Sequence, residues 1–287
     1  MIKDTALIFE GGGTRASYTA GALVTMLEEG IEYLDIYGIS AGSSHTVNYI
    51  SKDIGRSKAS FVEFMALPGV AGWGGFLRGR GYFNAEYIYE KACLGGERLP
   101  FNFEAFMENP ARPHIEAYEC DTGRTVYWGK DDITTLSDLM KRVRAGSTMP
   151  FFMNPIEIDG RVCLDGGLGD SWGIPLAQAK RDGYKKFFIV LTQTHGYRKA
   201  PERRPWLTKA LFGRRKNVVE RMLKRYKHYN AILDEIKALE KNGQAYVFYP
   251  RTMPVNSRTI DQPLLRESYR LGYEQAREEL RLWRDFL

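Results

Sequence analysis

Gly38-Ile39-Ser40-Ala41-Gly42 is the stretch that decides the fold. A short strand-like run over 35–39 leads into it, and a helix-like stretch comes after it. The pentapeptide fits Gly-x-Ser-x-Gly, the pattern of a serine seated on a sharp turn from strand to helix. Small residues on both sides allow that strained turn and let the Ser40 hydroxyl project near a helix N-terminus. Many such pentapeptides are ordinary loops in a chain with 29 glycines, so its meaning depends on the segments around it.

A second glycine-rich segment precedes this pentapeptide. Residues 6–9 form a short apolar run that predicts a buried strand, and Gly11, Gly12 and Gly13 predict a tight loop after it. Helical spacing of apolar residues follows, so the order is strand, helix, strand, helix. This predicts a parallel βαβ start in which the glycine loop and Ser40 share one edge of the sheet. Glycine amides there can donate to an oxyanion, and Arg15 is placed to steady the loop or to meet a phosphate.

The rest of the chain predicts one α/β domain over 1–287, because no Pro/Ser-rich linker divides it. The motif-bearing core spans 5–195 and a helix–strand–helix extension spans 197–287. We expect hairpins over 114–128 and 156–164, the second with a type I′ turn at Asp159-Gly160, strands over 186–191 and 245–249, an amphipathic helix over 217–242 and a last helix from Pro263.

Asp165-Gly166-Gly167 is the third segment with chemical meaning, directly after the second hairpin. A hairpin can hold a carboxylate rigidly, and two following glycines let another part of the chain pass close. Asp-Gly-Gly on its own is more often a turn than a catalytic base. Its meaning here comes from its occurrence together with Ser40 and the glycine loop.

With these segments the sequence resembles the patatin-like phospholipase family. The resemblance rests on Gly11-Gly12-Gly13-Thr14-Arg15, on Gly38 to Ser43 and on Asp165-Gly166-Gly167, in that order, and residues 144–152 also resemble the family's segment before the catalytic aspartate. It implies a three-layer α/β/α fold with a mostly parallel central sheet. One departure is Ala16, where many relatives have glycine, and we expect it to tighten the loop without abolishing activity.

The resemblance implies a Ser–Asp dyad with no histidine, no cofactor and no metal. Ser40 would be the nucleophile and Asp165 the base, acting on acyl esters of phospholipids or related lipids. The oxyanion hole would be formed by Gly11, Gly12 and Gly13, with support from Arg15, Gly38, Gly42, Gly166 and Gly167. Two other functions stay open: a carboxylesterase or thioesterase for smaller acyl substrates, and a non-catalytic acyl-binding or regulatory protein.

Two other sites are weighed against the dyad. The first loop also fits Gly-x-Gly-x-x-Ala, a dinucleotide-binding pattern, but Asp35, the acid about 20 residues on, opens the second strand instead of ending it. A Ser40–Asp165–His195 triad has the chain order of α/β-hydrolases, but Ser40 follows only the second strand, earlier than in that fold. We expect His195 to mark a strand end and His45 to be structural.

Composition places the chain among ordinary soluble globular proteins, with 44% hydrophobic and 26% charged residues. Its start has no secretory signal pattern, and three scattered cysteines suit a reducing compartment, so we expect a cytoplasmic protein. The net charge of +6 is concentrated in 197–216, where eight Lys or Arg residues accompany one acid. This segment is either a contact for an anionic membrane or a solvated basic face. No nucleic-acid motif accompanies this basic segment.

The stretch 66–83 is aromatic and rich in glycine. It is either a lid over the acyl pocket or an ordinary surface loop.

Overall fold

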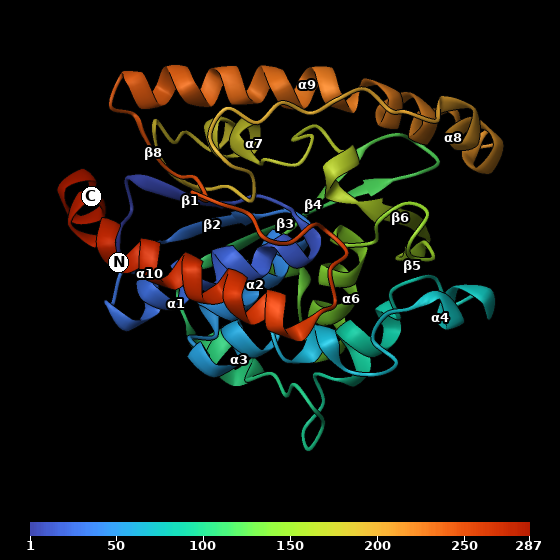
Figure 1. Ribbon diagram of the computed structural model, residues 1–287, viewed down its shortest axis with the longest axis horizontal. Coiled ribbons are helices and arrows are strands. Elements are labelled where there is room, and N and C mark those ends of the chain that lie inside the picture. Colours follow the sequence, from blue (N-terminus) through green and yellow to red (C-terminus); the bar gives the residue numbers. More distant parts are fainter.

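The computed structural model describes residues 1–287 and contains one eight-stranded sheet (Figure 1). The strand order is β5-β6-β3-β2-β1-β7-β8, and β4 pairs with β3 beside this path. The strands are β1 (Thr5–Phe9), β2 (Asp35–Gly38), β3 (Arg112–Glu119), β4 (Thr125–Trp128), β5 (Ile156–Ile158), β6 (Arg161–Asp165), β7 (Lys186–Val190) and β8 (Ala245–Phe248).

Strand β1 lies in the middle of the parallel part of the sheet and runs parallel to β2 on one side and to β7 on the other. The parallel part continues to β3 beyond β2 and to β8 beyond β7, whereas β4, β5 and β6 are antiparallel to their neighbours. Parallel strands end at the same edge of a sheet, so the segments after β1 and β2 meet there. The predicted parallel start and the mostly parallel sheet are therefore confirmed.

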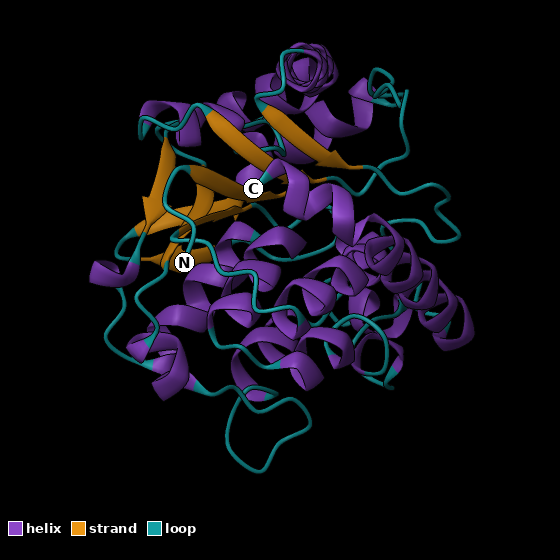
Figure 2. Ribbon diagram, turned by 90° about the vertical axis from the view of Figure 1, so that its left-hand side faces the viewer, coloured by secondary structure: helices purple, strands orange, loops and turns teal.

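Helices cover both faces of this sheet, which gives the predicted three layers (Figure 2). Leu7 and Phe9 of β1 join the core on one face, and Ala6 and Ile8 join the core on the other. Burial on both faces explains why β1 reads as a continuous apolar run. One face carries α1 (Ala16–Glu28), α2 (Ala41–Ile50), α6 (Leu136–Gly146) and α10 (Gln262–Phe286), and the other carries α7 (Leu176–Arg181) and α9 (Lys216–Lys241).

The remaining helices are short and lie outside the sheet layers. They are α3 (Ile54–Ala59), α4 (Trp73–Leu77), α5 (Phe103–Glu108) and α8 (Pro205–Phe212). No helix combines the length and the apolar character needed to cross a membrane. Both predicted hairpins are present, and the turn between β5 and β6 has φ of 52° at Asp159 and 73° at Gly160. Positive φ at both positions is what a type I′ turn requires.

The C-terminal extension joins the same sheet and the same core as the rest of the chain. Its strand β8 pairs with β7, and α10 lies along α1 (Figure 1). The two helices approach closely because glycines face the contact: a Cβ at Gly272 would lie 1.9 Å from the carbonyl oxygen of Tyr18. The Tyr18 hydroxyl also donates to Oε1 of Gln275 at 2.6 Å, inside the contact. Close helix packing thus attaches the end of the chain to its beginning.

Candidate active site

Ser40 lies on the turn between β2 and α2, with φ of 57° and ψ of −125°. Residues other than glycine rarely adopt positive φ, so this backbone is strained. The surroundings leave little room: a Cβ at Gly38 would lie 2.2 Å from the carbonyl oxygen of Gly42, and a Cβ at Gly42 would lie 2.3 Å from that of Phe9. The pentapeptide thus forms the predicted strand-to-helix turn, and both of its glycines are required sterically.

The glycine loop after β1 lies beside Ser40, since a Cβ at Gly11 would come 3.0 Å from the Cβ of Ser40. The amide of Gly11 donates to the carbonyl of Gly173 at 3.2 Å. The amides of Gly12 and Gly13 have no acceptor within the protein. Of the three predicted oxyanion donors, Gly11 thus has an acceptor within the protein, whereas the amides of Gly12 and Gly13 are free; their roles stay predictions.

A further free amide lies across from this loop and was not predicted. Ala41 is the first residue of α2, so its N–H has no partner inside the helix, and no other acceptor takes it. The residue after the nucleophile commonly contributes to the oxyanion hole at such a turn. Gly12, Gly13 and Ala41 are consequently the backbone donors available near Ser40.

Asp165 is the last residue of β6 and is buried. The amide of Gly167 donates to its Oδ1 at 2.7 Å, which leaves Oδ2 available to accept a proton. Burial raises the pKa of Asp165, while the positive charge of Arg225 and the hydroxyl of Ser40 act in the opposite direction. A carboxyl with a raised pKa is a stronger base than an exposed one. The predicted nucleophile and base are thus brought together.

Residues 146–148, at the C-terminal end of α6, connect the backbones of these two residues. The Ser40 amide donates to the carbonyl of Gly146 at 3.2 Å, and the Ser147 hydroxyl donates to the carbonyl of Ser40 at 2.9 Å. The carbonyl of Thr148 accepts the Asp165 amide at 2.9 Å. One short segment therefore positions both side chains, which gives a physical role to the stretch 144–152.

Glu116 on β3 supports the loop that follows Asp165, and sequence reasoning missed it. Its Oε1 accepts the Ser171 amide at 3.3 Å, and a Cβ at Gly166 would lie 2.3 Å from its carbonyl oxygen. Burial raises the pKa of Glu116 to about 8. No local pattern distinguishes it from an exposed strand glutamate, because only the loop packed over it buries its carboxyl.

Two cavities meet at Ser40. The larger has a volume of about 1040 Å³ and is bounded by the glycine loop, Asp165, residues 199–204 and α9. The smaller has a volume of about 40 Å³ and extends into an apolar region. Its apolar lining includes Phe61, Met65, Phe83, Ile88 and Met153.

The helix α9 is only partly a core helix. Ile236 is buried in the core away from the larger cavity, Tyr229 belongs to the core and also lines that cavity, and Met222 and Tyr226 line the cavity further along the helix. Arg225 lies between them and also lines it. The first half of α9 is therefore a wall of the candidate site, which its amphipathic pattern alone does not distinguish from core packing.

No histidine lines either cavity. His195 is exposed and packs edge-on against Tyr249, with ring centroids 5.0 Å apart. His45 is buried, its Nε2 lies 2.9 Å from the Thr19 hydroxyl, and burial lowers its pKa to about 3. The structure therefore does not assemble the alternative triad.

Asp35, the acid of the dinucleotide alternative, lies at the opposite end of β2 from Ser40. Its carboxylate is bound by Arg112, His114 and Tyr184, which lower its pKa to about 2 against the effect of burial. It is thus a structural acid far from the glycine loop. No group of three His, Cys, Asp or Glu side chains is arranged to hold a metal ion.

Comparison with known proteins decides the family. Residues 7–180, more than half of the chain, match the sequence model of the patatin-like phospholipases. The chain belongs to the patatin-like phospholipase family. A second model, described as a domain of unknown function (DUF6363), matches residues 215–287. The patatin-like match includes the glycine loop, Ser40 and Asp165, whereas Arg225 lies in the second region.

Two proteins are similar over most of the chain. The uncharacterized protein YjjU of Escherichia coli strain K12 is 26% identical over 283 residues, which cover 93% of this chain and 74% of YjjU. The crystal structure of VipD from Legionella pneumophila is similar with a TM-score of 0.51 and 11% identity. That match covers 96% of this chain and 66% of VipD. Because the identity is so low, the similarity concerns the fold alone. The predicted patatin-like α/β fold is confirmed.

Proposed function

We propose that this patatin-like protein is a serine hydrolase of lipid acyl esters in which Ser40 is the nucleophile and Asp165 the base. The observation that carries the proposal is that both side chains line one cavity, which no histidine reaches. The strained backbone at Ser40 and the raised pKa of Asp165 support the same roles.

The geometry suggests how the reaction proceeds. Ser40 Oγ attacks the ester carbonyl while Asp165 Oδ2 takes the hydroxyl proton, and the free amides of Gly12 and Gly13 stabilise the oxyanion. Collapse of the intermediate transfers that proton to the leaving alcohol and leaves an acyl-serine. Water then attacks the acyl group while Asp165 accepts its proton. The second intermediate collapses by breaking the bond to Ser40 Oγ, which takes that proton from Asp165, and the fatty acid departs.

The two cavities support a lipid as the substrate. The small cavity next to Ser40 is lined mainly by apolar side chains, which suits the first carbons of an acyl chain. Two methionines, Met65 and Met153, are in that lining, and their flexible side chains can move to admit a longer chain. The large cavity remains for the alcohol part of the ester. An acyl ester with a bulky polar alcohol would place its acyl carbons in the small cavity and its alcohol in the large one.

A substrate panel tests the proposed function. We expect hydrolysis of long-chain phospholipids, measured by fatty-acid release, and labelling of Ser40 by a fluorophosphonate probe. Turnover of short esters without any long-chain phospholipid would favour the carboxylesterase or thioesterase alternative. Absence of both labelling and turnover in the folded protein would favour the acyl-binding alternative.

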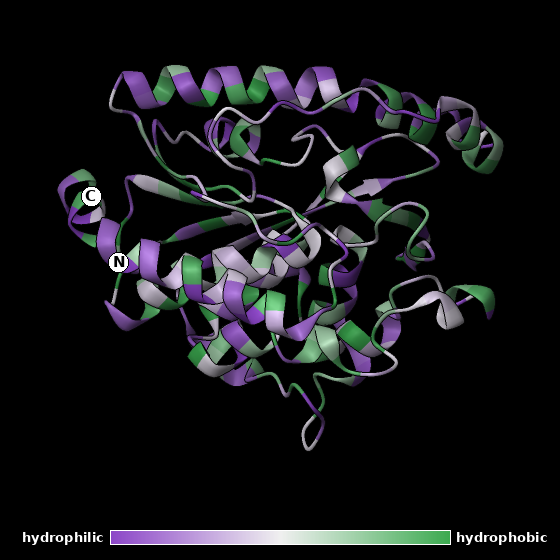
Figure 3. Ribbon diagram, viewed as in Figure 1, coloured by the Kyte–Doolittle hydropathy of each residue, from purple (hydrophilic) through white to green (hydrophobic).

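The mouth of the large cavity is bordered by two short helices with exposed apolar side chains. In α4, Trp73 is 63% and Leu77 84% exposed, and in α8, Trp206 is 66% and Leu211 61% exposed. Trp73 and Leu211 also line the cavity itself. Figure 3 shows apolar segments in both helices at the same end of the molecule, on the right of the view. Trp73 and Phe76 of the stretch 66–83 line the large cavity, and this supports the interpretation of that stretch as a lid.

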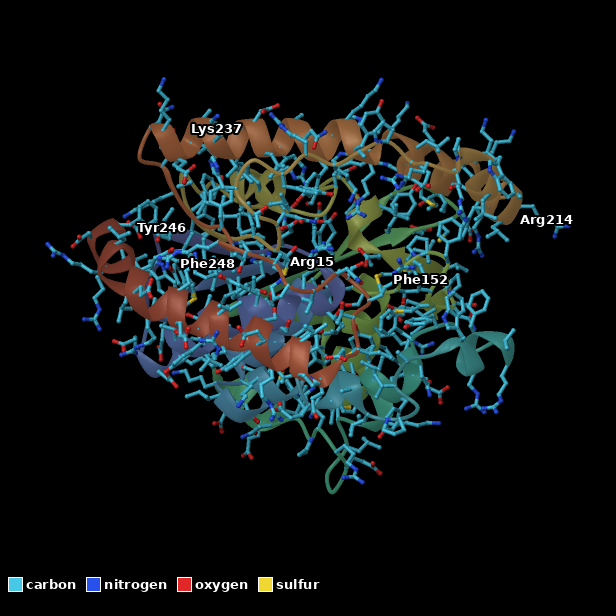
Figure 4. The ribbon with its side chains drawn as sticks, viewed as in Figure 1. Arg15, Phe152, Arg214, Lys237, Tyr246 and Phe248 are labelled. Atoms are coloured by element: carbon cyan, nitrogen blue, oxygen red, sulfur yellow. The ribbon has the colours of Figure 1, made fainter.

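Basic side chains accompany these helices. Two of the eight in 197–216 face carboxylates, Arg198 with Asp234 and Arg215 with Asp121 at 3.8 Å. Others are exposed near α8, and Arg214 projects outward beyond its end (Figure 4). We propose that α4 and α8 dock on an anionic lipid bilayer, with the apolar side chains inserted and the basic ones at the head groups.

We expect the protein to bind phosphatidylglycerol vesicles in a sedimentation assay, and binding to weaken with salt because the attraction is screened. The double variant Trp73→Glu/Trp206→Glu is expected to bind at least tenfold more weakly. Leu282→Glu changes another exposed apolar residue, on α10 and away from the cavity, and serves as the control. Equal binding to phosphatidylcholine vesicles, or no loss in the double variant, would contradict the docking surface.

A further inference from the structure

The cavity that contains Ser40 has more positive than negative charge. Six basic and three acidic residues line it. One of these acids, Glu10, is buried. Its carboxylate already accepts hydrogen bonds from the amide and hydroxyl of Thr192 and from the hydroxyl of Tyr229. A second acid is Asp165, the proposed base. The basic side chains therefore outnumber the carboxylates that neutralise them.

Lys199 is held in place although its ammonium forms no ion pair. Its amide donates to Oδ1 of Asn230 at 2.8 Å and its carbonyl accepts from Nδ2 at 3.0 Å, which fixes its backbone against α9. The ammonium lies 5.3 Å from the centre of the Tyr229 ring. Burial, followed by the positive charge of Arg225, lowers the pKa of Lys199 to about 8. The Lys199 ammonium therefore lacks a paired carboxylate that would balance its positive charge.

Two arginines face the same cavity, and neither forms an ion pair. Arg225 passes close to Gly167, since a Cβ there would lie 2.7 Å from its Nη2. Arg225 also lowers the pKa of Asp165, so it lies near the proposed base. Arg15 lines the cavity from the start of α1, below α9 in Figure 4, and its buried Nε has no acceptor. A buried donor without a partner is costly and indicates a missing acceptor.

We propose that Lys199 and Arg225, with Arg15, form a subsite for the phosphate of a phosphorylated lipid substrate. This rests on the proposed function and names its substrate class. Cations confined together repel one another, and a phosphate relieves that repulsion while accepting charge-assisted hydrogen bonds from the unpaired donors. In a glycerophospholipid only a few bonds separate the phosphate from the nearest acyl ester. A phosphate beside Arg225 therefore brings an ester within reach of Ser40.

Binding to the Ser40→Ala protein tests the subsite without turnover. By calorimetry, we expect dihexanoylphosphatidic acid to bind at least tenfold more tightly than dihexanoylglycerol, which has the same acyl chains but no phosphate. Adding Lys199→Met or Arg225→Met should remove most of this preference, and Lys199→Arg should retain it. Lys237→Met makes the same charge change on the exposed side of α9 (Figure 4) and should leave the preference unchanged.

Kinetics separates the subsite from the proposed function. In the wild-type background, Lys199→Met should raise KM for the phosphatidic acid at least tenfold more than KM for the diacylglycerol. Preferential binding that depends on Lys199, without hydrolysis by the wild type, would reject the function and keep the subsite. Hydrolysis with an unchanged ratio of KM values would reject the subsite. Inorganic phosphate that binds as tightly as the phospholipid would reject the lipid as the source of the phosphate.

Discussion

Ser40→Ala and Asp165→Asn are each expected to lower kcat by about 10⁴-fold or more, the scale on which nucleophile and base substitutions act in serine hydrolases. The first removes the attacking oxygen, and the second removes the carboxylate that accepts its proton. Asparagine is close to aspartate in size, so the hydrogen bond from the Gly167 amide to Oδ1 can be kept. Initial rates of ester hydrolysis, with circular dichroism to verify folding, measure the effect.

His195→Ala is the matched control for the dyad. The exposed imidazole packs on Tyr249 and lines neither cavity, so we expect kcat to stay within about twofold of the wild type. Loss of activity in a folded His195→Ala protein would overturn the dyad. Activity that survives in Asp165→Asn would equally exclude Asp165 as the base.

Gly272→Val is expected to lower the free energy of unfolding by about 3 kcal/mol or more, as overpacking against rigid neighbours does. A Cβ at this position would lie 1.9 Å from the backbone oxygen of Tyr18 and 2.8 Å from its carbonyl carbon. Backbone atoms cannot rotate away, so α1 and α10 must separate. The midpoint of thermal unfolding should fall by roughly 5 °C or more, measured by calorimetry.

Gly95→Val is the control for this substitution, because a Cβ there meets no atom within 4 Å. It should melt close to the wild type. We propose that residues 1–287 fold as one unit, and in that case Gly272→Val shifts a single cooperative transition. A separate early transition, with the glycine loop and Ser40 still in a folded core, would instead show that the extension unfolds independently.

Much of the fold was predictable from local sequence. The apolar run of β1, the turn at Asp159-Gly160 and the glycines around Ser40 act within a few residues, through burial and backbone angles. The third segment, Asp165-Gly166-Gly167, was predicted to follow a hairpin for the same reason. These features are visible in sequence because their physical causes are local.

Features that depend on contacts between distant parts of the chain could not be predicted from local sequence. The Gly11 amide, predicted as an oxyanion donor, donates to the carbonyl of Gly173, and no pattern around Gly11 indicates that contact. Glu116 became a buried acid only when the loop after Asp165 packed over it. In the same way Gly272 became essential only when α10 met α1.

By itself the sequence determined the strand-to-helix turn at Ser40, the glycine loop one strand away and the carboxylate after a hairpin, because each depends on backbone conformation over short stretches. Only the tertiary structure decided which amides stay free for an oxyanion and which cations share the cavity. Arg225 and Lys199 line the cavity of Ser40 from the extension, and their charges matter only after the sheet order places α9 over the site. Long-range packing sets the electrostatics of the site and joins its residues, and local sequence sets the backbone turns on which they stand.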